Sequence, residues 1–240
     1  MIPCPEFLDA RSPRSLQVFR LTPDEATSAP IYPDHPGFLE DGRSLLLHTA
    51  SGPQICRPDE GGTLQPLRDW VPDLGWHQLA PDGRHLVCRR GESQPEVLDL
   101  HRLDLRTGRI EPLFHAEGLL PGTRLPVDRM RIETVSWNGA RLGALAYLDY
   151  ERKPEGKTGI VVMDTATGSM EVVFSQPHPH SHLRYFPSAQ EPETHTLMVQ
   201  HHHDHLPDET GKQRPGLWQP DHRGVDLHIL RDDGTHWQDL

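Results

Sequence analysis

Short apolar runs bounded by turn residues recur along the chain, and this alternation predicts β-strands joined by tight turns. In three places an apolar run enters an acidic or amide residue followed by glycine, at Asp41-Gly42, Asp82-Gly83 and Asn138-Gly139. A second apolar run follows each of these turns, at 44–48, 86–89 and 144–148. Each phrase therefore predicts a β-hairpin, and almost no stretch has the period of an amphipathic helix.

The later half of each repeat closes on another turn that contains aspartate and glycine. The closing glycines are Gly62, Gly108, Gly168 and Gly234. Strand-rich units that recur every ~40 to 60 residues are typical of β-propellers, in which each unit is one four-stranded antiparallel blade. We therefore predict an all-β chain that holds about four blades.

The repeats leave no linker long enough to divide the chain, so we expect residues 1–240 to form a single β-propeller domain. The amino-terminal segment 1–30 precedes the first full repeat and holds one strand candidate, 16–22. A lone amino-terminal strand commonly completes the last blade of a propeller, so this strand is predicted to close the ring. Blades at the open edges of an incomplete ring would expose unpaired backbone groups, through which we expect self-association.

Composition limits the location of the protein. The 24 prolines and 20 glycines suit a fold with many tight turns. Mean hydropathy is −0.63, and no stretch approaches the roughly 18 to 20 apolar residues of a membrane span. The amino terminus, 1–7, lacks both the basic start and the apolar run of a secretion signal. We therefore expect a cytoplasmic protein without a membrane partner.

Charge and cysteine content narrow the partners further. The net charge of −11 disfavours a nucleic-acid surface, because binding phosphate requires a basic face. An anionic ligand would have to be held by a local cationic pocket. The three cysteines, Cys4, Cys56 and Cys88, match no zinc-motif spacing and are expected to be reduced thiols.

The fourth repeat carries an insertion, 200–224, that begins with the histidine-rich run His201-His-His-Asp-His205. Insertions in repeat proteins form loops on one face, and that face often binds ligands. Alternation along a strand would place His201, His203 and His205 on one side, which suits metal coordination. A solvated, histidine-rich loop without a ligand is the alternative.

Features around this insertion occur in a specific order. His182 precedes a Tyr185-Phe-Pro187 turn, and the apolar run before Gln200 leads into His201. A later apolar run ends in an acidic turn that closes on Gly234. This order resembles a central blade of the oligogalacturonate lyase family, and 19–22 is similar to that family's opening strand.

The resemblance implies a seven-bladed propeller that cleaves short pectin-derived galacturonates by β-elimination, with a divalent metal such as manganese. The implied partner is an anionic oligosaccharide, an oligogalacturonide. Proton abstraction beside a uronate carboxylate requires that carboxylate to be neutralised by a metal or an arginine, and it requires a positioned base. Histidine suits the base near neutral pH.

Site residues also follow from the resemblance. The candidates for substrate binding are His182, Arg184, His201 and His203. The candidates for metal binding are Gln200, His203 and His205, which have the Gln-Xaa-Xaa-His-Xaa-His spacing of the family's metal ligands. In the family, however, those ligands and the histidine of proton transfer lie in later blades, so they are expected beyond Leu240, the last residue of this chain.

The position of the family's functional arginine aligns best with Asp226, and Arg223 lies three residues earlier as the catalytic candidate. Because of these departures, little lyase activity is expected from this chain by itself. The rival hypothesis is a non-catalytic propeller that serves as a binding scaffold for a protein or carbohydrate.

Two further features have open interpretations. Trp76 is expected to pack between blades, and the neighbouring His77 to face the propeller's channel. Arg129 and Arg131 either meet a carboxylate of the ligand or belong to an exposed strand edge with paired charges.

Overall fold

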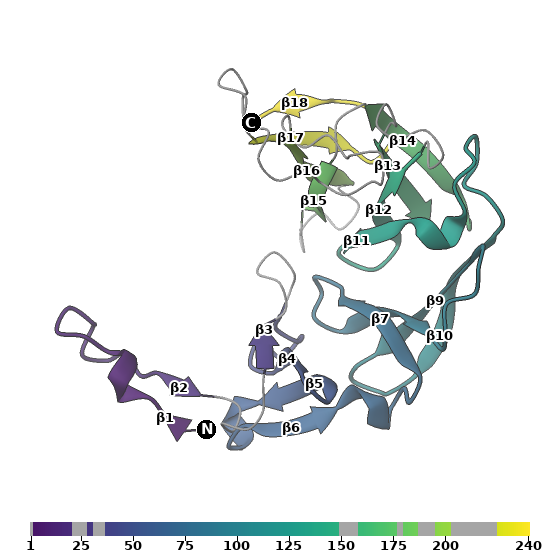
Figure 1. Cartoon of the computed structure of the whole chain (residues 1–240). Coiled ribbons are helices and arrows are strands. Elements are labelled where there is room, and N and C mark those ends of the chain that lie inside the picture. The colour runs from purple at the N-terminus through teal and green to yellow at the C-terminus, as the bar shows by residue number, and fades with distance from the viewer. Residues whose placement is uncertain are drawn as a thin grey trace. The chain divides into compact units, whose positions relative to one another are not determined.

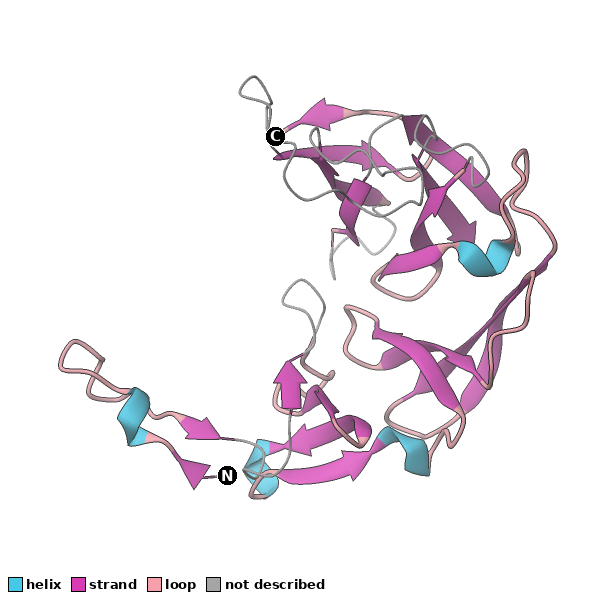
Figure 2. Cartoon of the chain, viewed as in Figure 1, coloured by secondary structure: helices cyan, strands magenta, loops and turns pink. Residues whose placement is uncertain are grey.

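The computed structural model describes residues 2–20, 28–30, 37–148, 158–176, 180–186, 195–202 and 225–240. Within these ranges the chain is all-β (Figure 1), and its helical elements are short 3-10 turns (Figure 2). These turns are η1 (Pro5–Phe7), η2 (Pro58–Glu60), η3 (Leu67–Asp69) and η4 (Val127–Arg129). No helix in the described part of the chain is long and apolar enough to cross a membrane.

Strands β3 to β18 form four four-stranded antiparallel sheets, and in every sheet the spatial order of the strands follows the chain. Each sheet is thus a meander of hairpins, the form of a propeller blade, because strands joined by short connections pair as neighbours. The predicted fold class and its four blades are confirmed for the described residues.

The blades have the following bounds. The first comprises β3 (Ser28–Pro30), β4 (Leu45–Thr49), β5 (Gly52–Arg57) and β6 (Thr63–Pro66). The second comprises β7 (Leu74–Leu79), β8 (His85–Arg90), β9 (Val97–Asp104) and β10 (Ile110–Glu117). The third comprises β11 (Arg131–Val135), β12 (Arg141–Tyr147), β13 (Thr158–Asp164) and β14 (Met170–Gln176). The fourth comprises β15 (His180–Tyr185), β16 (Thr196–His202), β17 (Val225–Arg231) and β18 (Gln238–Asp239).

Backbone contacts divide the chain into two compact units, 1–74 and 75–240. The first unit holds the first blade and a separate two-stranded sheet. The second unit holds the other three blades, apart from the first residue of β7.

The separate sheet of the first unit differs from the strand predicted at 16–22. It pairs β2 (Phe19–Arg20) with β1 (Ile2–Pro3), and residues 21 and 22 lie outside the described ranges. Proline at 3 and at 5 removes backbone donors from the partner segment, which keeps the ladder short. Closure of a ring by this strand stays a prediction.

The opening turns have the predicted chemistry. In the first, the Asp41 carboxylate accepts hydrogen bonds from the backbone N–H groups of Arg43 and Ser44, at 2.8 and 2.7 Å. Gly42 has a φ of 65°, a left-handed conformation that glycine adopts without strain. Asp82 accepts in the same way from the backbone N–H groups of two residues, and the side-chain oxygen of Asn138 accepts from the backbone N–H of Ala140. These residues serve local backbone structure, as side chains of this type do in turns.

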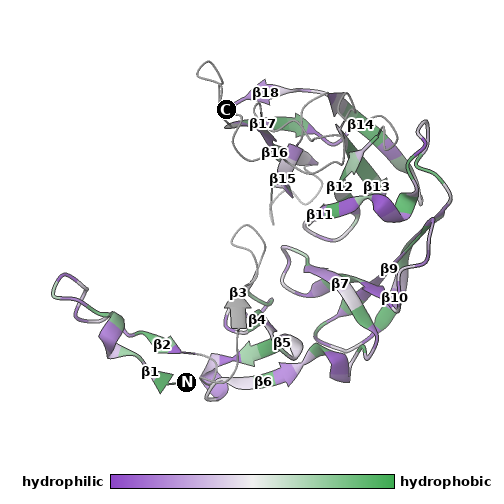
Figure 3. Cartoon of the chain, viewed as in Figure 1, coloured by the Kyte–Doolittle hydropathy of each residue, from purple (hydrophilic) through white to green (hydrophobic). Residues whose placement is uncertain are grey.

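Two apolar clusters hold the second unit together. One lies between the second and third blades, and it contains Leu98, Phe114 and Val161 with Trp76 packed against it, as predicted for that tryptophan. The other lies between the third and fourth blades. Because blades cover both of its faces, β13 is buried along nearly its whole length. Figure 3 shows the same apolar character in strands such as β5 and β17.

Candidate functional site

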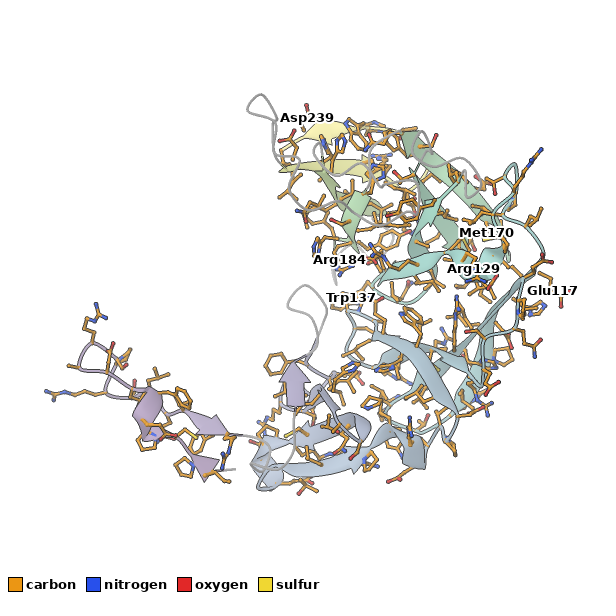
Figure 4. The ribbon with its side chains drawn as sticks, viewed as in Figure 1. Glu117, Arg129, Trp137, Met170, Arg184 and Asp239 are labelled. Carbon is orange, nitrogen blue, oxygen red and sulfur yellow. The ribbon has the colours of Figure 1, made fainter. Side chains whose placement is uncertain are left out.

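The strands that begin the second, third and fourth blades are joined by side chains that reach from one blade to the next. We call Gln78 on β7, Arg131 and Glu133 on β11, and Arg184 on β15 the first-strand cluster. Arg184 is labelled in Figure 4. All four residues belong to the second compact unit.

Glu133 is the centre of the cluster. Its backbone carbonyl accepts a hydrogen bond from Nε2 of Gln78 at 3.2 Å and another from Nη1 of Arg184. Its carboxylate forms an ion pair with the guanidinium of Arg131 and lies 3.6 Å from Nη1 of Arg184. One residue therefore ties three consecutive blades together.

The cluster carries a local positive charge. The side chain of Arg184 is only 11% exposed and that of Glu133 is 14% exposed, so the buried guanidinium needs the carboxylate as its counter-charge. Arg131 adds a second guanidinium on a side chain that is 64% exposed. The exposed guanidinium of Arg131 is thus an accessible positive charge on a chain whose net charge is −11.

Arg184, a predicted substrate-binding residue, is largely buried and contacts other groups of the protein. Its Nη1 atom also donates to the carbonyl of Leu183. The exposed cation of the cluster is instead Arg131, for which the sequence left two interpretations open. Its ion pair with Glu133 fits the paired-charge interpretation, and its exposure also leaves it able to meet a ligand.

His182, a second predicted substrate-binding residue, lies in a β-bulge of β15. Its φ is 50°, and it is half-buried. Ser181 pairs with Gln200 and Arg184 pairs with Met198, so two residues of β15 stand opposite one residue of β16. Histidine is among the non-glycine residues that tolerate this conformation, and bulges of this kind are common beside functional sites.

The bulge decides the direction of Arg184. In a regular strand His180 and Arg184 would point to the same face, because side chains alternate with a period of two. Here His180 pairs with His201 and Arg184 pairs with Met198, which places them on opposite faces of the sheet. Arg184 reaches the first-strand cluster as a result, and His180 packs against the third blade.

His201, a third predicted substrate-binding residue, is 7% exposed and lies on β16. Nδ1 of His201 is 3.3 Å from Nε2 of His228, and its ring also contacts that of His180. Gln200 is half-buried beside it and pairs with Ser181. The structure thus places His201 in a row of histidines on the face that carries His180.

Three predicted residues, His203, His205 and Arg223, lie outside the described residues. Within the described ranges, no group of three or more histidine, cysteine, aspartate or glutamate side chains could hold a metal ion. The described residues therefore do not provide the metal site implied by the resemblance.

The end of the chain bears on the same expectation, which placed the family's metal ligands beyond Leu240. The side chain of Leu240 is 71% exposed, and its backbone N–H donates to the carbonyl of Leu227 at 3.0 Å. Leu240 directly follows β18, the last strand of the fourth blade. Metal ligands that follow Leu240 stay a prediction.

A cavity of about 180 Å³ lies on the second blade, at the turn between β8 and β9, and no residue of the first-strand cluster lines it. Arg89 and Arg90 line one part, and Asp99, His115 and Glu117 line another. The carboxylates exceed the arginines once Glu92 is counted, so this cavity lacks the excess positive charge that a uronate requires.

The structure of the chain is similar to those of two oligogalacturonate lyases. One, from Vibrio parahaemolyticus, has a TM-score of 0.60 and 15% identity, over 97% of this chain and 57% of that one. The other, solved in complex with manganese, has a TM-score of 0.59 and 16% identity, over 93% of this chain and 56% of that one. The chain has the β-propeller fold of these lyases. It spans less than two thirds of the length of either lyase.

Other comparisons are negative: no family model matches the chain, and no curated protein matches its sequence. The resemblance first read from the sequence is therefore confirmed at the level of the fold.

Sequence reasoning missed several residues of this region. Gln78, His228 and Asp239 were not singled out. Gln78 contacts Glu133 of the cluster, His228 contacts the predicted residue His201, and Asp239 contacts His228. The signal that would have found them is the strand register within a blade and the side-chain contacts between blades, which a repeat pattern alone does not supply.

Proposed function

We propose that the protein is an oligogalacturonate-lyase-like propeller that binds short anionic oligogalacturonides at the first-strand cluster and, by itself, cleaves them by β-elimination only weakly. The observation that carries this proposal is the likeness of its fold to two oligogalacturonate lyases over 97% and 93% of the chain. The first-strand cluster supports it, because it offers the local positive charge that an anionic sugar needs on an acidic protein.

In this proposal Arg131 meets a uronate carboxylate, since its guanidinium is exposed and its planar fork matches a carboxylate in two hydrogen bonds. The buried guanidinium of Arg184 adds positive charge next to Glu133 and holds that carboxylate in place. Oε1 of Gln78 is a buried acceptor to which none of the described residues donates, and it would accept from a sugar hydroxyl.

The reaction itself requires a base to take the proton from the carbon beside the carboxylate. The electron pair then forms a double bond in the sugar ring as the glycosidic C–O bond breaks, and the leaving oxygen takes up a proton. Neutralising the carboxylate lowers the barrier by stabilising the charge that develops on it. Arg223 stays the proposed catalytic residue, and His182 the proposed neighbour of the ligand.

One of the two lyase structures holds manganese, so a divalent metal is part of the hypothesis for this protein. The candidates His203 and His205 lie outside the described residues, and the described ones form no metal-binding group of three. No step above passes through a metal. If a chelator abolished the activity and added manganese restored it, the protein would be shown to require a divalent metal.

The full chain should be incubated with trigalacturonate, and the unsaturated product followed by its ultraviolet absorbance. Binding should be measured by calorimetry in parallel. Arg131→Gln should weaken binding by about tenfold, the value of a charge-assisted hydrogen bond. Arg109→Gln is the matched control, because Arg109 is 77% exposed and also pairs with a glutamate, outside the cluster. It should bind as the wild type does.

The outcomes separate the two function classes. Binding with no unsaturated product supports the scaffold hypothesis. Neither binding nor product from the wild-type chain would show that the proposal is wrong. A seven-bladed ring, a cytoplasmic location and self-association through blade edges remain proposals that go with the lyase hypothesis.

A further inference from the structure

The cavity of about 180 Å³ on the second blade lies at one end of its sheet, and we call it the second-blade cavity. Its charged residues include Arg89 and Arg90, the last two residues of β8, Asp99 on β9, and His115 and Glu117 on β10. Glu117 is labelled in Figure 4. The three strands are neighbours in the order β8, β9, β10, so these residues follow one another across the sheet.

A loop of defined shape forms the rim of the cavity between β8 and β9. Gly91 begins this loop with a φ of 66°, a left-handed conformation that suits glycine. At the other end, the backbone N–H of Glu96 donates to the carboxylate of Asp128 at 3.0 Å. The backbone N–H of Val97 donates to the carbonyl of Gln94 at 3.2 Å. Hydrogen-bonded backbone therefore bounds the cavity on this side.

The guanidinium of Arg89 has no partner among the described residues. Its Nε atom is buried and makes no hydrogen bond to any of them. Burial lowers the pKa of Arg89, and the charge of Asp128 counteracts that shift. Within the described part of the chain, however, Asp128 forms its ion pair with Nε of Arg129, at 3.5 Å. A partly buried cation without a counter-charge is costly, so an anion bound in the cavity would stabilise Arg89.

The side of the cavity formed by β9 and β10 carries negative charge. Asp99 and His115 are paired across the two strands, and Nδ1 of His115 lies 3.6 Å from the carboxylate of Asp99. Nε2 of His115 lies 3.1 Å from the carboxylate of Glu117. The side chains of Asp99 and Glu117 are 53% and 71% exposed, so a ligand can reach both carboxylates. One histidine cannot balance two carboxylates, and this side therefore attracts a cation.

We propose that the second-blade cavity binds a free basic amino acid, lysine or arginine. The carboxylate of the ligand meets the guanidinium of Arg89, its α-ammonium group meets Asp99, and the cation of its side chain meets Glu117. Neighbouring strands are ~4.7 to 4.9 Å apart, which separates β8 from β10 by roughly 9 to 10 Å. A ligand that contacts both ends must hold its charges far apart, and the long side chain of a basic amino acid does so.

Size and charge select the same class of ligand. The cavity has room for about six water molecules of ~30 Å³ each, and it is smaller than the ~300 to 1,000 Å³ of pockets for drug-sized ligands. Its two arginines and three carboxylates, Glu92 included, leave a net charge of −1 when His115 is neutral. A basic amino acid has a charge of +1. The site shares no residue with the first-strand cluster, so it does not depend on oligogalacturonide binding.

Binding of free lysine and free arginine to the full chain, measured by calorimetry, tests the proposal on the wild type. Two probes each lack one end of lysine: norleucine has no side-chain cation, and cadaverine has no carboxylate. Each probe should bind at least about tenfold more weakly than lysine, because it loses a charge-assisted hydrogen bond. The proposal is overturned if either probe binds as tightly as lysine, or if neither basic amino acid binds.

Variants locate the site. Arg89→Gln should weaken lysine binding by at least about tenfold, and Glu117→Gln should weaken the binding of lysine but not that of norleucine. Arg109→Gln is the matched control, because Arg109 is an exposed arginine of the same blade that does not line the cavity. It should bind lysine as the wild type does.

Two results with these variants would contradict the site. If Arg89→Gln binds lysine as the wild type does, Arg89 is not the partner of the ligand. If Arg109→Gln loses as much affinity as Arg89→Gln, the effect belongs to net charge. A third result concerns the kind of ligand: lysine that is capped at both its amino and carboxyl groups should bind at least about tenfold more weakly than free lysine. Equal binding would overturn the proposal and indicate a lysine side chain of a partner protein instead.

Discussion

Thr134 accepts a hydrogen bond from the backbone N–H of Tyr185, with 2.9 Å between Oγ1 and N. Both residues are buried, at 3% exposure each, and the bond joins the first strands of the third and fourth blades. A buried amide that loses its acceptor costs more than the bond itself contributes.

Thr134→Val keeps the shape of the side chain and removes the acceptor, so it should lower the free energy of unfolding by about 1 to 3 kcal/mol. Thr134→Ser keeps the hydroxyl and should lower it less. Urea unfolding of the full chain measures both. Equal losses in the two variants would show that the methyl group, rather than the hydrogen bond, is what matters at this position.

Alanine substitutions at two closing-turn glycines, Gly108 and Gly234, distinguish the cost of a left-handed backbone from the cost of a steric clash. Gly234 has a φ of 81°, and a Cβ atom added there would lie 2.1 Å from the backbone oxygen of Val173 on the third blade. Gly108 has a φ of 70° and nothing within 4 Å of such an atom. Gly108→Ala should cost about 1 to 2 kcal/mol from the left-handed backbone alone. Gly234→Ala should cost clearly more, and thermal unfolding should show a lower Tm; similar Tm values would contradict the close approach of these blades.

Arg84 and Asp104 link stability to pH. Hydrogen bonds from the Arg84 guanidinium, at 3.1 Å for Nε, hold the pKa of Asp104 well below its usual range. A carboxyl with a lowered pKa in the folded state stabilises the fold above its unfolded pKa of about 3.9, and that stability is lost as the pH falls through the folded pKa.

Arg84→Met should therefore lower the free energy of unfolding by about 1 kcal/mol at pH 7, and the deficit should shrink as the pH falls below about 4. The control is Arg109→Met, which removes a 77% exposed arginine and should change stability by less than about 0.5 kcal/mol at either pH. A deficit that is independent of pH would contradict the assignment.

Asp232 should have the opposite pH dependence. Burial raises the pKa of this carboxyl, while His195, Arg141 and the hydroxyl of Tyr185 counteract the shift. A raised pKa in the folded state means that stability falls as the pH rises from about 4 through the folded pKa. Asp232→Asn cannot ionise, so its stability relative to the wild type should improve over that rise.

Urea unfolding at pH 4 and pH 7 measures this difference. Asp233→Asn is the control next in the chain, because hydrogen bonds from Thr235 lower the pKa of Asp233 instead. The Asp233 variant should not gain on the wild type as the pH rises. A gain of the same size in both variants would show that the effect belongs to net charge.

Local features of the fold could be predicted from the sequence, and non-local ones could not. The turn at Asp41 and Gly42 uses side-chain and backbone preferences that act within four residues, so its pattern is visible in the chain. The packing of Trp76 also follows from its place in a repeat. The length of the strand predicted at 16–22 does not, because it depends on a partner segment that contains two prolines.

The candidate site depends on pairing between distant residues. Sequence analysis placed His182, Arg184 and His201 in one group, and strict alternation along β15 would have kept His180 with Arg184. The extra residue at the bulge separates them, and the strand pairing of the fourth blade is what reveals it. The roles of His203, His205 and Arg223 lie beyond the described residues and stay predictions.

The carbonyl of Glu133 serves donors from both neighbouring blades, Gln78 on one side and Arg184 on the other. A shared acceptor means that one sheet cannot tilt away without releasing the next. Amide protons of β7, β11 and β15 should therefore exchange with solvent deuterium in concert, at one opening free energy.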